Sequence, residues 1–216
     1  MIKLTKRVLP PPLKAKVDSW YSQHMSLLRS GAPVPPSLVA NYRDPHLKEE
    51  IRRETSDKCA YCESKVSHVY PGDVEHILPK SKVPEKTLVF DNLTYACHAC
   101  NNLKSDYYDP SCPLIDPYRD DPQDHLIGFG AFVFRRPGSV KGFNTEELLK
   151  LNRPALAERR SERIESVKRL ADTYARLPPN RVRDAIAEEL RKEAAPDREY
   201  SLVVQNYISQ VCGINP

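Results

Sequence analysis

The chain carries two Cys-x-x-Cys pairs, Cys59-Ala60-Tyr61-Cys62 and Cys97-His98-Ala99-Cys100, with 34 residues between them. Four thiolates in two tight pairs match the preference of Zn²⁺ for soft sulfur ligands in a tetrahedron. A single pair would be weak evidence, whereas two pairs around a short segment are typical of a structural zinc site. We therefore predict that these four cysteines bind one zinc ion; two redox pairs, or simply buried cysteines, are the alternatives.

The segment between the pairs contains the residue types that phosphodiester hydrolysis needs. It includes Asp73-Val74-Glu75-His76-Ile77-Leu78-Pro79 and Asp91-Asn92-Leu93, and Asn101 follows the second pair directly. An imidazole titrates near neutral pH and so can take the proton of an attacking water. A cation held by few protein ligands keeps open positions for a phosphate.

The expected secondary structure brings these residues together. The predicted elements are two strands and one helix, at residues 72–77, 93–97 and 98–107. Neighbouring strand residues point to opposite faces, but at a strand end both Glu75 and His76 can flank one cleft. On the helix, Asn101, Lys104 and Ser105 would share a face.

The order of these residues resembles the HNH motif of the ββα-metal endonucleases. The resemblance rests on Glu75-His76-Ile77-x-Pro79, Asn92-Leu93 and Cys97-x-x-Cys100-Asn101-x-x-Lys104. It implies that His76 is the general base and that Glu75 and Asn101 hold the catalytic cation. It also implies that Asn92 holds the loop and the imidazole in place. Many family members have Asp and His where this chain has Glu75 and Asn101, and oxygen ligands at both positions favour Mg²⁺ or Mn²⁺.

Basic residues suggest two further contact regions. Lys80 and Lys82 follow the motif, and with Lys104 they are candidate phosphate contacts; a solvated loop is the alternative. Residues 135–183 hold 13 Lys/Arg against 6 Asp/Glu in a chain of net charge +4. Within them an arginine cluster is a candidate for binding a partner protein or nucleic acid, with a solvated helix face as the alternative. The cluster consists of Arg159, Arg160 and Arg163.

Composition predicts a folded cytoplasmic protein. The chain has 216 residues, of which 40% are hydrophobic, and it contains no run of 18 apolar residues that would span a membrane. Residues 1–16 carry charges and three consecutive prolines where a signal peptide needs an apolar core. Cys112 and Cys212 are expected to be free thiols in a reducing compartment.

We expect an α+β fold, in which a zinc-stapled ββα-metal core is embedded in a mostly helical surround. The predicted parts are an N-terminal arm with helices, the HNH module, an acidic loop with short strands, and a C-terminal helical region: residues 1–56, 57–108, 109–144 and 145–216. Helices are expected at 13–29, 46–55, 155–177, 181–194 and 201–211, with a strand in 125–136. The capping-box pattern Asn144-x-x-Glu147 predicts another helix start, and the aspartates of 106–124 are expected to form turns.

Outside the core motif the chain resembles the PtuB-like branch of the HNH family, the nuclease subunits of Septu-type and retron-associated phage-defence systems. Together with Glu75-His76, the matching stretches are Cys59-Ala60-Tyr61-Cys62-Glu63, Pro113-Leu114-Ile115-Asp116-Pro117 and Leu151-Asn152-Arg153-x-x-Leu156-x-x-x-Arg160. The resemblance implies a hetero-oligomer with a PtuA-like ATPase of the ABC/SMC type. The chain has no Gly-x-x-x-x-Gly-Lys-Ser/Thr loop, so any ATP dependence must come from that partner.

The sequence thus predicts a metal-dependent endonuclease with structural Zn²⁺ and catalytic Mg²⁺ or Mn²⁺. DNA is the favoured substrate, and RNA, including tRNA, is the alternative. A non-catalytic zinc module that binds nucleic acid or a partner protein is the rival interpretation. Glu75, His76 and Asn101 distinguish the two, because a binding module has no use for a pair of cation ligands beside a base.

Overall fold

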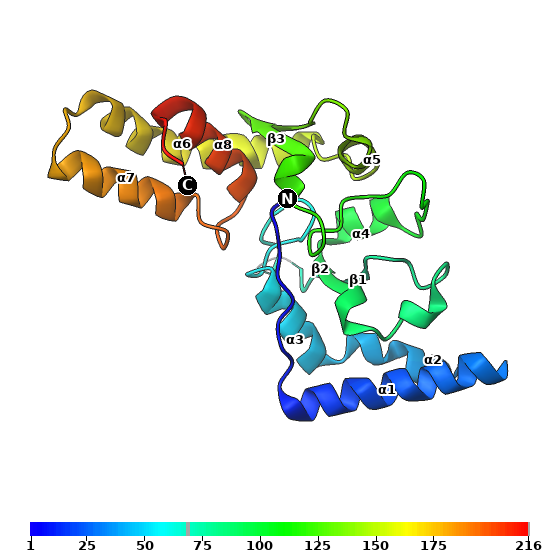
Figure 1. Ribbon diagram of the computed structural model, residues 1–216. Coiled ribbons are helices and arrows are strands. Elements are labelled where there is room, and N and C mark those ends of the chain that lie inside the picture. The colour runs from blue at the N-terminus through cyan, green and yellow to red at the C-terminus, as the bar shows by residue number, and fades with distance from the viewer. Residues whose placement is uncertain (68–69, 216) are drawn as a thin grey trace. The chain divides into compact units, whose positions relative to one another are not determined.

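The computed structural model describes residues 1–67 and 70–215, which Figure 1 traces in chain order. The chain forms two compact units that are not contiguous in sequence. The N-terminal unit consists of Leu4–Ala60 and Val66–Ser111. The C-terminal unit consists of Met1–Lys3, Tyr61–Lys65 and Cys112–Pro216. Each is described separately below.

The N-terminal unit combines helices with a short antiparallel ribbon. Its main elements are α1 (Pro11–Ser30), α2 (Pro36–Val39), α3 (Pro45–Glu54), β1 (Asp73–His76), β2 (Leu93–Ala96) and α4 (His98–Lys104). Strands β1 and β2 pair antiparallel, with Glu75 opposite Thr94 and His76 opposite Leu93. Helix α3 packs against β2 and α4 against β1. This is the ββα arrangement that the motif predicted, and it confirms the α+β fold class.

The helix ends of this unit follow from local sequence. Helix α1 begins in a run of prolines, which are tolerated in a first turn, and ends at Gly31, whose φ of 69° is left-handed. Helix α3 begins after Asp44, whose side chain accepts hydrogen bonds from the amides of His46 (2.9 Å) and Leu47 (3.2 Å). Both helices were predicted, α1 starting two residues earlier than expected.

The core of the N-terminal unit lies under the ribbon. Its buried side chains come from the arm, α1, α2, the 3-10 turn Ala40–Arg43, α3, the loop before β2 and β2 itself: Leu9, Val17, Leu38, Tyr42, Leu47, Ile51, Leu88, Leu93 and Tyr95. Trp20 is partly buried against this cluster and packs on it. Gly72 precedes β1 with φ of 65°, and a Cβ there would collide with the ring of Tyr95. The close approach of backbone and ring requires glycine at the start of β1.

The C-terminal unit is mostly helical around one hairpin. Its elements are β3 (Leu126–Phe129), β4 (Phe132–Arg135), α5 (Val140–Leu148), α6 (Pro154–Arg176), α7 (Arg181–Glu193) and α8 (Ser201–Cys212), with 3-10 turns elsewhere. Helices α6 and α7 run side by side, and α8 packs on α6 and β3 (Figure 1). The buried face includes Leu156, Ile164, Val167, Leu190 and Leu202.

The expected helix start at Asn144 is wrong. Helix α5 already begins at Val140, because the Ser139 hydroxyl accepts a hydrogen bond from the Gly142 amide at 2.9 Å and caps the helix. Asn144 therefore lies inside the helix. The hairpin of β3 and β4 turns at Gly130, with φ of 55°, within the stretch that the sequence suggested as one strand.

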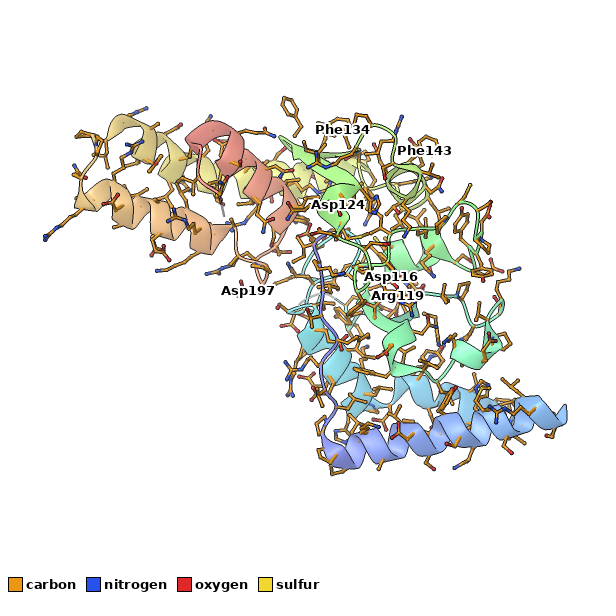
Figure 2. The ribbon with its side chains drawn as sticks, viewed as in Figure 1. Asp116, Arg119, Asp124, Phe134, Phe143 and Asp197 are labelled. Carbon is orange, nitrogen blue, oxygen red and sulfur yellow. The ribbon has the colours of Figure 1, made fainter. Side chains whose placement is uncertain are left out.

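The acidic stretch before the hairpin forms turns. Asp116 accepts a hydrogen bond from the Tyr118 amide at 2.9 Å and lies 3.6 Å from Arg119, as labelled in Figure 2. Asp120 pairs with Lys141 at 2.6 Å. In residues 1–67 and 70–215, the four cysteines are the one group of three or more His, Cys, Asp or Glu side chains that lie close enough together to hold a metal ion. Among these same residues, no helix is long and apolar enough to cross a membrane.

Candidate active site

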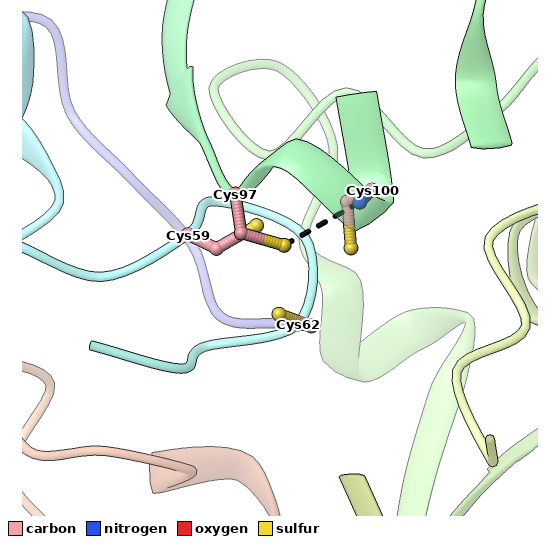
Figure 3. Close-up of side chains that lie close together, drawn as sticks. All are labelled: Cys59, Cys62, Cys97 and Cys100. Atoms are coloured by element: carbon pink, nitrogen blue, oxygen red, sulfur yellow. Dashed lines mark hydrogen bonds between the residues drawn. The ribbon is translucent and has the colours of Figure 1, made fainter. Parts of the chain in front are cut away.

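The four cysteines of the two pairs converge on one point. Cys59, Cys62, Cys97 and Cys100 are all buried, and their sulfurs lie within 4.8 Å of one another (Figure 3). The Cys97 sulfur also accepts a hydrogen bond from the Cys100 amide at 3.4 Å and so caps the start of α4. The second pair is therefore built into the first turn of the helix that carries Asn101.

This cluster fits a tetrahedral zinc ion. Zinc–sulfur bonds of about 2.3 Å in a tetrahedron place the sulfurs roughly 3.8 Å apart, so the cluster needs only a small contraction to hold the ion. Four buried sulfur ligands suit a closed structural site rather than a catalytic one. A metal site is thus supported by the geometry, in agreement with the spacing of the cysteines.

A cleft of about 420 Å³ opens beside the ββα ribbon, entirely within the N-terminal unit. It contains three of the predicted site residues, Glu75, His76 and Asn101. Most of the remaining lining is polar: Tyr42, Arg43, Lys48, Asp73, Lys80, Ser81, Ser105 and Asp106. The cleft therefore brings together a carboxylate, an imidazole and a carboxamide under a rim of basic side chains.

His76 is held in one orientation at the end of β1. Its Nε2 lies 2.9 Å from the Thr87 carbonyl oxygen, and its ring packs edge-on against Tyr42 with centroids 4.6 Å apart. A carbonyl oxygen only accepts hydrogen bonds, so in the neutral imidazole Nε2 carries the proton and Nδ1 keeps the lone pair. This is the tautomer in which Nδ1 is the basic atom.

The surroundings of His76 keep the imidazole neutral. Its pKa is lowered to about 4, chiefly by burial and also by the nearby cations Lys80, Lys104 and Arg43, while the hydrogen bond to Thr87 acts in the opposite direction. The side chain is 6% exposed. At neutral pH the ring is therefore an unprotonated acceptor, as a general base must be.

Glu75 is buried next to a lysine. Lys104 Nζ, on α4, donates to Glu75 Oε1 at 2.6 Å and to the His76 carbonyl oxygen at 2.7 Å. Burial raises the pKa of Glu75, and the adjacent Lys104 opposes that rise. This position does not suit the expected contact between Lys104 and a phosphate. The lysine is only 2% exposed, and its ammonium group already pairs with the Glu75 carboxylate.

Asn101 faces the cleft from α4, one turn before Lys104. Its amide Nδ2 donates to Asp73 Oδ2 at 2.9 Å, and Asp73 lies on the same side of β1 as Glu75. The hydroxyl of Tyr70 donates to the other oxygen of Asp73 at 3.0 Å. Oxygen donors suited to a hard cation, from Glu75 and Asn101, thus line one cleft.

Asn92 holds the loop that follows β1. Its Oδ1 accepts from the Leu78 amide at 2.8 Å, and its Nδ2 donates to the carbonyls of Leu78 and Lys86 at 2.9 and 3.1 Å. The expected support of the loop agrees with these bonds. The imidazole itself is held by Thr87, and not by Asn92 as the resemblance had implied. The path of the loop after β1 brings the Thr87 carbonyl to the ring.

The other predicted lysines are placed differently from each other. Lys80 lines the cleft, with Nζ 2.9 Å from the Tyr42 hydroxyl and above its ring. Lys82 is exposed and pairs loosely with Asp106 at 3.4 Å. Lys80 is therefore the better placed of the two to meet a phosphate at the cleft.

The arginines of α6 are engaged within the C-terminal unit to different degrees. Arg160 is 2% exposed, and its guanidinium donates to the Leu151 carbonyl at 2.7 Å. Arg163 pairs with Glu193 of α7 at 2.5 Å. Arg159 is exposed and pairs with Glu162 one turn away at 2.9 Å. Of the predicted cluster, Arg159 is the member whose side chain faces solvent most fully.

Asp73 and Arg43 line the cleft but were not singled out in the sequence. Asp73 had a readable signal, because it stands two residues before Glu75, and alternate strand residues share a face. Arg43 had none, since the chain brings residues 40–43 to the cleft through tertiary packing of a short 3-10 turn.

Comparison with known proteins agrees with this geometry. Residues 59–107 match the family model described as HNH endonuclease. The Septu protein PtuB of Bacillus thuringiensis is 27% identical over 179 residues, which cover 76% of this chain and 68% of that protein. The Septu protein PtuB of Bacillus mycoides (strain KBAB4) is 26% identical over 153 residues, covering 56% of this chain and about half, 52%, of that protein. The segment that holds Glu75, His76 and Asn101 thus matches the HNH endonuclease family model, in a chain similar to Septu PtuB proteins.

Proposed function

We propose that the chain is a metal-dependent endonuclease that hydrolyses phosphodiester bonds, with DNA as the favoured substrate. The observation that carries the proposal is the state of His76. Its Nε2 is fixed on the Thr87 carbonyl, its ring is neutral, and it lines the same cleft as Glu75 and Asn101. A zinc module that only binds nucleic acid would gain nothing from a buried neutral imidazole beside two oxygen ligands.

In this proposal His76 is the general base. Nδ1 accepts a proton from the attacking water, and the positive charge that forms is stabilised by the Nε2–H bond to the Thr87 carbonyl. The edge contact with Tyr42 keeps the ring from rotating. Asn92 acts indirectly, by holding the loop that carries Thr87 in place.

Glu75 and Asn101 are the residues that would hold the catalytic cation, Mg²⁺ or Mn²⁺. When bound, such an ion supplies charge neutralisation at the scissile phosphate and at the leaving oxygen. Lys104 bonds to only one of the two Glu75 oxygens, Oε1, so a carboxylate oxygen can still serve as a ligand. Lys80, Lys48 and Arg43 on the cleft wall are placed to orient the nucleic-acid backbone.

Cleavage of supercoiled plasmid tests this proposal. The purified chain, alone and with its co-expressed genomic neighbour, is expected to nick plasmid when Mg²⁺ or Mn²⁺ is present and to stop when a weak chelator removes the labile ion. Parallel reactions with single-stranded DNA, RNA and tRNA decide the substrate class. Binding of these nucleic acids without cleavage under all ionic conditions would favour the non-catalytic zinc module instead.

The similarity to Septu PtuB proteins extends the proposal to phage defence. We place the chain in a cytoplasmic hetero-oligomer with a PtuA-like ATPase of the ABC/SMC type, whose nucleotide state governs access to the cleft. The support is the match over 76% of this chain, together with the extent of the C-terminal unit, which an HNH motif does not need. Exposed Arg159 is the cluster member best placed to dock such a partner, since its planar fork pairs well with carboxylates.

A further inference from the structure

The amide of Asn101 is fixed by its neighbour on β1. Asn101 Nδ2 donates to Asp73 Oδ2 at 2.9 Å. An ionised carboxylate accepts hydrogen bonds and donates none, so only the nitrogen end of the carboxamide can face Asp73. The other end, Oδ1, is thereby turned away from Asp73 in the cleft that Glu75 also lines.

Asp73 is itself held on both oxygens. The Tyr70 hydroxyl donates to Oδ1 at 3.0 Å, while Oδ2 takes the Asn101 amide, with His98 more distant at 3.6 Å. A carboxylate used in this way is poorly placed to be a cation ligand. It is well placed to orient one, because partners behind a ligand fix which atom it presents.

We propose that Asp73 is a positioning residue that holds the Asn101 carboxamide with its oxygen presented to the catalytic cation. This inference rests on the proposed function and deepens it. An asparagine has one end that binds a cation and one that repels it.

The orientation can be tested by exchanging the two side chains. Asp73→Asn keeps the shape but supplies an amide that can donate to Asn101 Oδ1, so the carboxamide is free to turn its nitrogen to the cation. The double variant Asp73→Asn, Asn101→Asp restores a single arrangement: the new amide donates to one carboxylate oxygen and the other faces the cation. Asp106→Asn removes a charge from the same cleft without touching Asn101 and is the matched control.

Mn²⁺ affinity, followed by electron paramagnetic resonance of the zinc-loaded full-length chain, is the readout. Asp73→Asn is expected to weaken Mn²⁺ binding about 10- to 100-fold, as removal of a residue behind a ligand does. The double variant is expected to recover most of that loss, and Asp106→Asn to change affinity little. Wild-type affinity in Asp73→Asn, or an equal loss in Asp106→Asn, would overturn the positioning role.

Plasmid cleavage by the same proteins separates this inference from the proposed function. A wild type that binds Mn²⁺ but cleaves nothing would remove the nuclease proposal and leave the Asp73 result to stand on binding alone. If Asn101→Ala binds Mn²⁺ as tightly as wild type, the positioning role of Asp73 is overturned, whatever the cleavage result. Under the inference, Asp73→Asn also shifts the Mn²⁺ concentration needed for half-maximal cleavage, with the rate at saturating Mn²⁺ nearer to wild type.

Discussion

At the residue scale, the cleft consists of polar groups held in unusual states by burial. The pKa of His76 is lowered to about 4, chiefly by burial, while burial raises the pKa of Glu75 and the adjacent Lys104 opposes that rise. Burying such groups costs free energy unless each is paired. His76 is paired with a backbone carbonyl, Glu75 with the ammonium group of Lys104, and Asn101 with a carboxylate. These pairings also fix the atom that each side chain presents to the cleft.

The lowered pKa of His76 makes stability depend on pH. In the unfolded chain His76 has a pKa near 6.5, whereas in the folded chain it is about 4. Below pH 6.5 the unfolded state therefore binds a proton that the folded state does not, and stability falls as pH falls. Between pH 7 and pH 5 this group should remove about 2 kcal/mol from the free energy of unfolding.

Urea denaturation of wild type and His76→Gln at the two pH values measures this effect. The four-cysteine cluster is common to both proteins, so the effect of an ion bound there cancels in the comparison. The wild type is expected to lose more stability than the variant on acidification. Equal losses would mean that His76 titrates normally and is not buried as described.

The pair of Lys104 and Glu75 should be strongly coupled. Lys104→Met leaves a buried carboxylate with no cation, and breaking such a pair costs about 3 kcal/mol. The double variant Glu75→Gln, Lys104→Met is expected to be more stable than the single variant, because no unpaired charge remains. Thermal denaturation of all three proteins provides the comparison, and a single variant as stable as wild type would contradict the buried pairing.

Added Mn²⁺ gives this experiment a second readout. A cation bound at Glu75 replaces the missing ammonium, so Mn²⁺ should raise the melting temperature of Lys104→Met more than that of wild type. The double variant lacks the carboxylate and should respond least. A uniform response of the three proteins would argue against Glu75 as a ligand.

Much of the site was predictable because its residues are close in sequence and lie on short regular elements. The alternation of β1 and the turn of α4 suffice to place Glu75, His76 and Asn101 near one another. The partners of those residues were not predictable in the same way. Thr87 reaches His76, and Lys104 is buried, only because of the path of the loop and the packing of α4 on β1.

At the element scale, the sequence predicted the helices that have a clear apolar stripe. It did not predict the bounds of the short helix α5, whose start depends on its cap. Helices α1, α3, α6, α7 and α8 all appear near the expected bounds. The start of α5 was misplaced because two capping patterns compete in the same stretch, and Ser139 prevails over Asn144. A four-residue capping pattern does not show which of two nearby candidate residues caps the helix, because that choice depends on tertiary packing.

Contacts between α6 and α7 divide the arginine cluster into two roles. Arg163→Glu would place a carboxylate beside Glu193 and lower the stability of the helical hairpin, since like charges repel where an ion pair now forms. Arg159→Glu faces solvent and should leave stability within about 0.5 kcal/mol. We expect Arg159→Glu, but not wild type, to lose the ATPase partner in size-exclusion chromatography while thermal stability is retained.

Salt dependence distinguishes a partner face from a nucleic-acid face. If Arg159→Glu keeps the ATPase but binds nucleic acid with a flatter dependence on salt, the side chain contacts phosphates. That result would contradict the docking role. Arg191→Glu on α7, another exposed arginine with an intrahelical partner, is the control for a general effect of charge.

At the scale of the whole molecule, the four-cysteine cluster, with the zinc ion that we predict for it, is the feature on which folding is expected to depend. Cys59, Cys62, Cys97 and Cys100 come from two segments far apart in sequence, so the ion would close a long loop. Metal analysis should find about one zinc per chain. Cys100→Ser is expected to lose zinc and much of its helical signal, because metal binding and folding are coupled in such sites, whereas Cys112→Ser, outside the cluster, should keep both.

The composition of the sequence does not reveal which segments of the chain form each compact unit. The two compact units interleave in sequence, since residues 1–3 and 61–65 group with the C-terminal unit. Proline-rich stretches and changes of charge suggest contiguous parts, such as those proposed at 57–108 and 145–216. Only long-range contacts reveal which short segments pack together.

The central claim is that His76 is the base of a divalent-ion-dependent nuclease, and single-turnover cleavage by His76→Ala tests it most directly. With zinc content and circular dichroism unchanged, we predict a loss in cleavage rate of about 10²- to 10⁴-fold, with nucleic-acid binding retained. His46→Ala, which removes an exposed histidine of α3, should cleave like wild type. Cleavage by folded, zinc-loaded His76→Ala at the wild-type rate would contradict the account.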